Sequence, residues 1–470
     1  MLSNRYIFSF LFIVIFVLSI TTTWYENLVY ILFGFVILLV LDKLGKGIVL
    51  REIILLHTTL VCLIMPLLGY NVYNANNELA QIWFRYMLVS PEDYFGFTLP
   101  AVTAFAIALC WPMNDRKADD EGISVNDIIE QIKLTLSQNS KVGVVLLISG
   151  ILIFQIGDIF PTSLKFIFQL FYYTSFVGLL YVYYSKDLPF RRVYLVLFIL
   201  YILILALQSG MFTIVAYMGM TIFSFFFLGK KVSLPRKVIF FAASIFILLV
   251  IQAVKPAYRK LTWKQNYSEN KASLFFDLAS KKISKGEILD PNSFFFIYYR
   301  INQGYNISMV MRRVPLRQPH DEGKILLRTI TASIVPRFLW PDKPEAGGKF
   351  NMRYYAGYVL KGFSTNIGPL GEAYGGFGVY GGVCYMFFLG LFIRYAYKKI
   401  FLISKRFPII ILWIPVLFFQ TTYSAETDTH QILNSLIKSA VFVFVLYKFL
   451  PFLFSGKPVS KVYNNKVIAI

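Results

Sequence analysis

Cysteine is scarce in this chain of 470 residues, which carries only three. Cys62, Cys110 and Cys384 each lie inside an apolar run. A disulfide framework or a thiolate metal site needs more cysteines than these, at closer spacing. We therefore expect small buried side chains at all three positions and neither kind of site.

Histidine and acidic residues are also in short supply. The three histidines lie far apart in the sequence and show no metal-ligand spacing. No segment follows the Gly-x4-Gly-Lys-Ser/Thr pattern of a phosphate-binding loop, so nothing predicts nucleotide chemistry. The 46 Lys and Arg outnumber the 25 Asp and Glu, which gives a formal charge of +21. In a membrane protein, so basic a chain suits lipid head groups and phosphorylated lipids better than nucleic acid, and we expect no nucleic acid partner.

Apolar residues are abundant, at 57% of the chain, with a mean hydropathy of +0.62. Apolar runs of about 18 residues recur along the chain, which is typical of membrane-spanning helices. We expect an all-α polytopic membrane protein with about twelve transmembrane helices, the first of them an uncleaved helix. The expected spans are Tyr6–Thr23, Leu28–Leu41, Ile53–Tyr70, Phe97–Pro112, Val142–Ile156, Leu164–Tyr184, Val193–Leu207, Met211–Leu228, Val238–Val254, Phe377–Ile393, Phe407–Gln420 and Ile432–Phe454.

The charges of the short connections predict the topology. Four connections and the tail after Gly456 are basic, and all five share one side of a twelve-span arrangement, so both termini are expected in the cytoplasm. These connections are Lys43–Arg51, Ser185–Arg192, Gly229–Lys237 and Arg394–Arg406. Residues 1–254 then hold spans one to nine with a cytoplasmic loop at 113–141. Residues 255–371 form one large external loop between spans nine and ten, and residues 372–470 hold spans ten to twelve and a cytoplasmic tail.

The external loop is unusually basic, with nineteen Lys and Arg against eight Asp and Glu. We expect the lysines from Lys255 to Lys285 to be solvated. The arginines lie among apolar and aromatic residues, where guanidinium groups bind phosphate bidentately. We expect two or more of them to hold a phosphate, and they are Arg300, Arg312, Arg313, Arg317, Arg328, Arg337 and Arg353.

Prolines are concentrated in the middle of this loop. Pro336 and the Pro341–Pro344 segment end a predicted helix, Leu326–Val335, and fix an extended turn that carries Arg337, Trp340 and Lys343. Such a turn suits an anion bound beside a sugar ring. An anchor at the membrane interface, where Trp and Arg are common, is the alternative.

Few side chains in the expected external segments are able to accept a proton. The candidates are Glu372, Asp428, His320 and His430. Glu372 lies at the start of the tenth span, where an ionisable group is a functional candidate, although pairing with a loop arginine is the alternative. His430 at a helix start also suits a capping role, and His57 in the third span suits a buried hydrogen-bonded group.

Three motifs in the same region resemble those of a known family. Residues 335–344 read Val-Pro-Arg-Phe-Leu-Trp-Pro-Asp-Lys-Pro, residues 368–374 read Gly-Pro-Leu-Gly-Glu-Ala-Tyr, and residues 377–382 read Phe-Gly-Val-Tyr-Gly-Gly. Over roughly Arg312–Gly382 the chain is similar to the O-antigen (Wzy-type) polysaccharide polymerases. One departure is visible, because many relatives carry an arginine near Gln208-Ser209-Gly210, where this chain has Met211.

The resemblance implies a metal-independent glycosyltransferase that needs no cofactor and polymerises lipid-linked repeat units on the outer face of a bacterial inner membrane. Its partners would be an undecaprenyl-pyrophosphate-linked oligosaccharide, membrane lipid and a chain-length regulator. The resemblance carries over Arg337 and Glu372 as functional positions, and it brings Tyr374 into the motif. Tyr354 and its neighbours suit stacking on sugars. An O-antigen ligase or another lipid-linked glycosyltransferase, and a transporter or flippase of lipid-linked sugars, are the alternatives.

Overall fold

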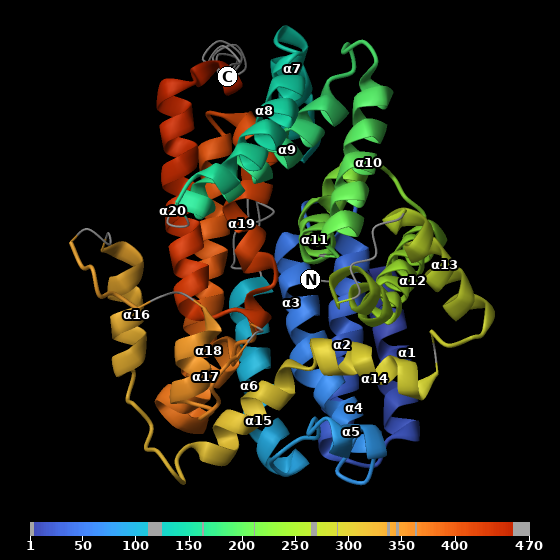
Figure 1. The fold of residues 1–470 in the computed structure, drawn as a ribbon, viewed down its shortest axis with the longest axis vertical. Coiled ribbons are helices and arrows are strands. Elements are labelled where there is room, and N and C mark those ends of the chain that lie inside the picture. Colours follow the sequence, from blue (N-terminus) through green and yellow to red (C-terminus); the bar gives the residue numbers. More distant parts are fainter. Residues whose placement is uncertain are drawn as a thin grey trace, which may run out of the picture.

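The computed structural model describes residues 4–110, 125–161, 164–210, 212–264, 270–288, 290–335, 339–344, 347–361 and 364–454. Within these ranges the chain is helical and contains no β-strand. The helices form an elongated bundle, and segments from both ends of the sequence run along its long axis (Figure 1). The expected all-α fold is therefore confirmed.

Nine helical segments of the described chain are long and apolar enough to cross a membrane. They are α2 (Trp24–Lys43), α3 to α4 (Leu50–Asn71), α6 (Pro91–Cys110), α9 (Lys165–Tyr184), α10 (Arg191–Ser209), α12 with the turn after it (Leu234–Trp263), α18 (Gly368–Ser404), the segment containing α19 (Pro408–Glu426) and α20 (Thr429–Phe449). A tenth is possible if α7 (Val125–Gln138) and α8 (Val142–Ile156), which meet at an 83° bend, form one broken span. The helices α1 (Asn4–Ile20) and α11 (Thr213–Phe227) are apolar but shorter.

Small residues let the helices pack closely. In α18, a Cβ placed on Gly390 would lie 2.8 Å from the Cβ of Ala108 and 2.9 Å from the carbonyl oxygen of Phe105, both in α6. In α9, a Cβ on Gly178 would lie 2.6 Å from the backbone nitrogen of Leu147 in α8. Close backbone approach at small residues is the usual way in which membrane helices associate, because lipid provides no hydrophobic drive between them.

The basic connections come together at one end of the bundle. The backbone N–H of Gly229 donates to the carbonyl of Gly45 at 3.1 Å, and the Lys230 ammonium donates to the Tyr183 hydroxyl at 2.7 Å. The Tyr397 hydroxyl donates to the carbonyl of Ile48 at 3.1 Å. Four segments that the sequence grouped by charge are thus neighbours in space.

The long connection between α12 and α18 is built from short helices. They are α13 (Lys271–Ser284), α14 (Pro291–Ile301), α15 (Gln303–Arg313), α16 (Lys324–Ile334) and α17 (Gly348–Tyr354). Figure 1 shows α13 and α16 on opposite flanks of the bundle, while α14 and α15 cross its lower half. Near α4 lies a further short helix, α5 (Glu78–Ile82).

One expectation for this connection is wrong. Lys255 is buried, with 9% of its surface exposed, rather than solvated. The reason is that α12 (Leu234–Arg259) continues past the apolar run and carries Lys255 against the bundle. The lysines of α13 match the expectation better, since Lys281 is exposed.

Candidate functional site

Glu372 lies in the first turns of α18 and is held by donors from two other segments. Its Oε1 accepts a hydrogen bond from the Asn351 amide in α17 at 2.7 Å. Its Oε2 accepts from the backbone N–H of Thr429 at 2.9 Å and from the Thr429 hydroxyl at 2.5 Å. The Tyr385 hydroxyl bonds the same threonine. Glu372 therefore joins α17, α18 and the start of α20, and no arginine is among these partners.

Asp428 caps the N-terminus of α20 and is almost fully buried. Its Oδ1 accepts from the backbone N–H of Gln431 at 2.5 Å, as an N-cap residue does. Its Oδ2 accepts from the backbone N–H of Gly347 and from the Asn366 amide, each at 2.9 Å. Both oxygens are engaged by the protein itself, which favours a structural role for this carboxylate.

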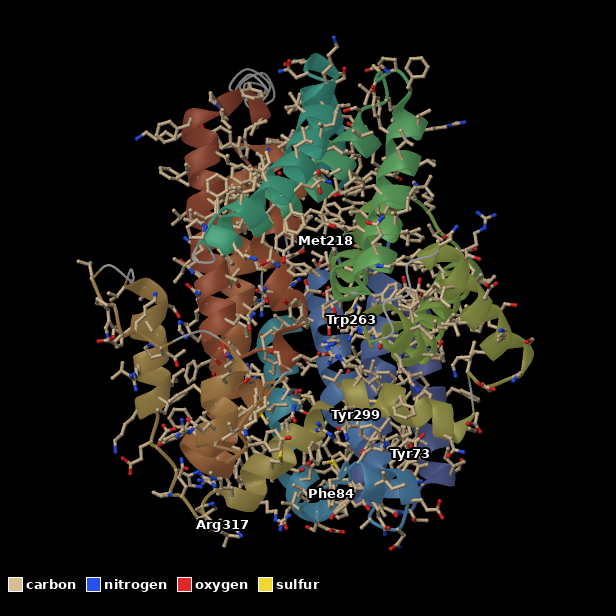
Figure 2. The ribbon with its side chains drawn as sticks, viewed as in Figure 1. Tyr73, Phe84, Met218, Trp263, Tyr299 and Arg317 are labelled. Carbon is tan, nitrogen blue, oxygen red and sulfur yellow. The ribbon has the colours of Figure 1, made fainter. Side chains whose placement is uncertain are left out.

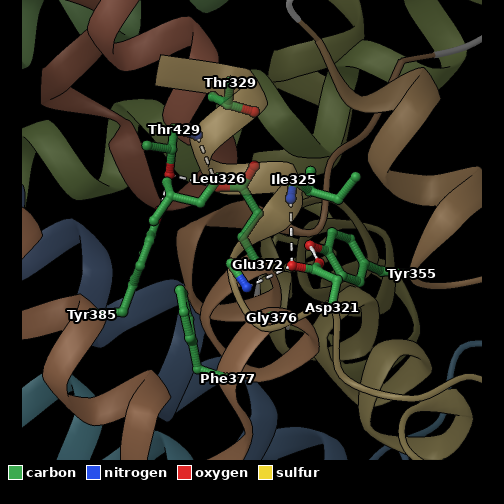
Figure 3. Close-up of a pocket in the computed structure, with 11 residues that line it drawn as sticks. Asp321, Ile325, Leu326, Thr329, Tyr355, Glu372, Gly376, Phe377, Tyr385 and Thr429 are labelled. Atoms are coloured by element: carbon green, nitrogen blue, oxygen red, sulfur yellow. Dashed lines mark hydrogen bonds between the residues drawn. The ribbon is translucent and has the colours of Figure 1, made fainter. Parts of the chain in front are cut away.

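A narrow hollow opens beside Glu372 (Figure 3). Asp321 lines it and accepts from the backbone N–H of Gly323 at 2.8 Å and from the Tyr355 hydroxyl. Burial and the neighbouring Asp321 carboxylate raise the pKa of Tyr355 above its usual value, so the phenol stays a donor. Thr329 of α16 closes the hollow from the other side (Figure 3).

A second narrow hollow shares the wall of α16 with the first. Arg328, Asp428 and His430 line it, together with Asn351, the residue that donates to Glu372. The structure thus brings together four of the side chains that the sequence singled out: Arg328, Glu372, Asp428 and His430. We call Glu372, Asp428, Asn351 and Thr429 the Glu372 cluster.

A second polar cluster centres on Glu426, at the end of the segment that contains α19. The Arg300 guanidinium of α14 forms an ion pair with Oε2 of Glu426 at 3.0 Å. Oε1 of Glu426 accepts from the Tyr217 hydroxyl of α11 at 2.8 Å and lies 3.1 Å from Nε2 of His57 in α3. The carboxylate raises the pKa of Arg300 above its usual value, so this guanidinium is always charged.

Two further cations, Lys255 and Arg259, interact electrostatically with the Arg300 of this ion pair. Lys255 interacts electrostatically with Glu426, Arg300 and Arg259. Arg259 donates from Nε to the carbonyl of Gly210 at 3.0 Å, and its guanidinium lies 4.2 Å from the ring centre of Trp263. Many of the polymerases that the chain resembles carry an arginine near Gln208-Ser209-Gly210, where this chain has Met211. Here Arg259 of α12 contacts that segment instead. Glu426, Arg300, His57, Tyr217, Lys255 and Arg259 are called the Glu426 cluster.

The two clusters are joined by one turn, Ser424–Asp428. Glu426 points from this turn toward α3, α11 and α14, whereas Asp428 points toward α17 and the start of α18. The turn therefore directs its two acidic residues into different clusters. Gly368, with φ of +71°, packs against the carbonyl of Ala425 in the turn.

Replacing Gly368 with alanine is expected to destabilise the protein and disturb both clusters. A Cβ there would collide with the Ala425 carbonyl oxygen, and the left-handed backbone itself costs a non-glycine residue about 1–2 kcal/mol. Gly286→Ala is the matched control, because Gly286 has φ of +67° but nothing within 4 Å of an added Cβ. Thermal unfolding in detergent should show the larger loss for Gly368→Ala. Equal losses of stability in the two variants would mean that the Ser424–Asp428 turn shifts away from the added Cβ at little cost.

His320 and Tyr374 form a contact at the base of α18. The rings of His320 and Tyr374 meet edge to face with centroids 5.7 Å apart, and His320 Nδ1 lies 3.3 Å from the carbonyl of Gly375. The carbonyl is only an acceptor, so Nδ1 is the donor and Nε2 carries the lone pair. Nε2 lies near Gly378, where α18 departs from helical geometry.

The remaining arginines spread away from both clusters. Arg312, Arg317 and Arg353 are exposed, and Figure 2 shows Arg317 at the lower edge of the molecule, well below Trp263. Arg313 lies against the backbone of Gly357, and its Nε is buried without a hydrogen bond inside the described part of the chain. The structure therefore brings Arg300 and Arg328 to polar clusters and leaves these four apart.

The predicted proline turn is only partly described. Arg337 lies outside the described residues. Lys343 donates to the carbonyls of Ala332 at 2.8 Å and Val335 at 2.9 Å, so its ammonium caps the C-terminus of α16. Trp340 is half-buried in the turn before it, and Tyr354 stacks on Phe350 with ring centroids 5.6 Å apart.

Five of the six residues of the Glu426 cluster were not selected from the sequence as site residues: Glu426, His57, Tyr217, Lys255 and Arg259. His57 is the buried, hydrogen-bonded group that the sequence predicted. Ionisable residues within or at the end of an apolar run mark functional sites in membrane proteins, and this signal applied to His57 and Lys255. Among the described residues, no group of three or more His, Cys, Asp and Glu side chains is arranged to hold a metal ion.

Comparison with known proteins gives one match. Residues 122–452 match a family model described as a domain of unknown function, DUF8712. No curated protein and no solved structure matches the chain. The matched region contains every residue of both clusters except His57.

Proposed function

The chain belongs to the DUF8712 family, and we propose that it is a polymerase that joins undecaprenyl-pyrophosphate-linked oligosaccharide repeat units into a surface polysaccharide. It would act on the outer face of a bacterial inner membrane, as a metal-independent glycosyltransferase. The observation that carries the proposal is the Glu426 cluster, in which Arg300 is paired with a carboxylate inside a bundle of apolar helices and interacts electrostatically with two further cations, Lys255 and Arg259.

The proposal includes a topology of twelve spans with both termini in the cytoplasm. The nine long segments, the bent pair and the two shorter apolar helices make up that number. The meeting of the four basic connections at one end supports the topology, because the positive-inside rule assigns such an end to the cytoplasm. The segment containing α19 starts near this end and reaches Glu426 at its other end, so the Glu426 cluster would open toward the outer leaflet.

The excess of positive charge in the Glu426 cluster suits a diphosphate. In the proposed reaction the diphosphate leaves the growing glycan, and negative charge builds on its oxygens. Arg300, Lys255 and Arg259 would stabilise that charge without a metal, as preorganised donors do at about 3–4 kcal/mol of barrier each. Glu426 holds Arg300 in place before substrate arrives.

The walls of the two hollows beside the Glu372 cluster suit contacts with sugars of the repeat units. They combine carboxylate and amide groups with aromatic walls, among them Tyr355, Phe350 and Tyr385, and such surfaces bind sugar hydroxyls and faces. Arg328 and His430 add charged and polar contacts to the second hollow. Lipid tails would enter between helices from the side.

Deleting the protein tests the proposal against its alternatives. Gel electrophoresis of the surface glycan should show the ladder collapsing to a single repeat unit. Loss of a ligase would instead leave polymer on its carrier lipid, and loss of a flippase would leave no glycan at the surface. Either of these patterns would replace the polymerase proposal.

The few charges inside the spans and the absence of an evident repeat in the sequence favour an enzyme over a transporter.

Arg337→Lys tests the motif that carried the resemblance. We expect the variant to insert normally but to lose most of its elongation, because a point charge does not reproduce the planar guanidinium fork. The length of the glycan ladder is the readout, with membrane abundance measured by immunoblot. A ladder of normal length would remove Arg337 from the site.

A further inference from the structure

His57 lies in the middle of the bundle, with 7% of its surface exposed. It belongs to α3 (Leu50–Thr59), which passes directly into a π-helical turn at Leu60–Ile64. Such turns occur often at functional sites because they displace side chains from the regular helical positions. The imidazole packs edge to face against the Tyr217 ring, with centroids 5.8 Å apart.

The hydrogen bonds of the Glu426 cluster determine which nitrogen of His57 carries the proton. Glu426 is ionised because it pairs with Arg300, so both of its oxygens are acceptors. His57 Nε2, at 3.1 Å, must therefore be the donor. In the neutral ring this leaves the lone pair on Nδ1.

Nδ1 of His57 is buried and has no hydrogen-bond partner within the described residues. A buried polar atom without a partner is costly, and more so between apolar helices where water is scarce. The ring is nevertheless held in one orientation by Glu426 and Tyr217. A carboxylate that fixes an imidazole while its second nitrogen is left unpaired is the arrangement of a general base.

We propose that His57 is the proton acceptor of the transfer reaction and that Glu426 positions it; this inference rests on the polymerase function proposed above. The acceptor hydroxyl oxygen forms a bond to the anomeric carbon of the donor glycan. The bond between that carbon and the diphosphate oxygen breaks, and its electron pair leaves with the diphosphate. The hydroxyl proton passes to Nδ1 of His57 and is later released to water.

The groups around His57 fit this role. Glu426 is next to the positive charge that the proton brings, and Tyr217 and Arg300 hold the carboxylate in place. Lys255 of α12 also interacts electrostatically with Glu426. The base and the proposed diphosphate site are thus joined through a single carboxylate.

His57→Gln tests the inference, because the glutamine amide still donates to Glu426 but offers no base. Elongation of lipid-linked repeat units by the purified protein in lipid nanodiscs should fall by about 10²–10⁴-fold, the usual contribution of a general base. Tyr217→Phe, which removes one hydrogen bond to Glu426 and keeps the imidazole, should lose only several-fold.

His57→Ala provides a second route if the glutamine variant does not fold. Added imidazole should restore elongation to a folded alanine variant, and it would do nothing for a side chain that only packs. A glutamine variant as fast as the wild type, or a folded alanine variant that imidazole fails to rescue, would overturn the assignment to His57. Failure of the wild-type protein to elongate repeat units would instead overturn the polymerase proposal.

Discussion

Arg300→Gln is expected to reduce the surface glycan to a single repeat unit. The variant loses the cation nearest to Glu426, and one preorganised donor to the leaving diphosphate is worth about 3–4 kcal/mol, or roughly 10²–10³-fold in rate. It also leaves the Glu426 carboxylate, 11% exposed, without its ion pair. Glycan ladders from cells and elongation rates of the purified protein are the measurements.

The stability of the Arg300 variant should fall less than its activity. Breaking a fully buried ion pair costs about 3–5 kcal/mol, and we expect on the order of 2 kcal/mol here because 46% of the Arg300 side chain is exposed. Lys281→Gln in α13 is the control for loss of one positive charge, since Lys281 is exposed and contacts neither cluster. A normal ladder from a stable Arg300→Gln protein would contradict the proposed diphosphate site.

Glu372→Gln should have the largest effect on stability among conservative changes in the Glu372 cluster. All three donors to Glu372 come from Asn351 and Thr429, so the glutamine NH₂ must face another donor. Hydrogen bonds to a charged group contribute about 1.5–3 kcal/mol each, and we expect a loss on the order of 2 kcal/mol in the free energy of unfolding. Thermal unfolding in detergent measures it.

The elongation rate of the Glu372→Gln variant distinguishes a structural role of Glu372 from a role in proton transfer. If Glu372 only joins α17, α18 and α20, the folded Glu372→Gln protein should keep its elongation rate within a few-fold. Thr429→Ser is the matched control, because it keeps both the backbone and the hydroxyl donor. A fall of about 10²-fold or more in the folded variant would make Glu372 the general base in place of His57.

Hydrophobic patterning predicted the positions of the helices well. Within lipid a segment must satisfy its own backbone hydrogen bonds, so a long apolar run is expected to be a helix. The predicted run Val142–Ile156 has the same bounds as α8. Ends were missed where polar or glycine-rich sequence continues a helix. The run that began at Phe377 belongs to α18, which starts at Gly368, and the run that ended at Val254 belongs to α12, which continues to Arg259.

Side-chain partners were harder to predict than helices. His57 and Glu426 are 369 positions apart in the sequence, and only the packing of α3 against the end of the α19 segment brings them together. Lysine is a residue type that binds phosphate, but the ammonium of Lys343 donates to two carbonyls at the end of α16. Residue type therefore identified a basic, aromatic region, while the pairing within it depends on tertiary contacts.

The turn Ser424–Asp428 has a thermodynamic consequence. Its two acidic residues anchor opposite clusters from positions only two residues apart, and Gly368 leaves the turn no free space on one side. A ligand that shifts Glu426 must then also alter the contacts of Asp428. Linkage requires the effect to be reciprocal, so donor and acceptor should change each other's affinity by the same factor, and titrating one in the presence of the other would reveal it.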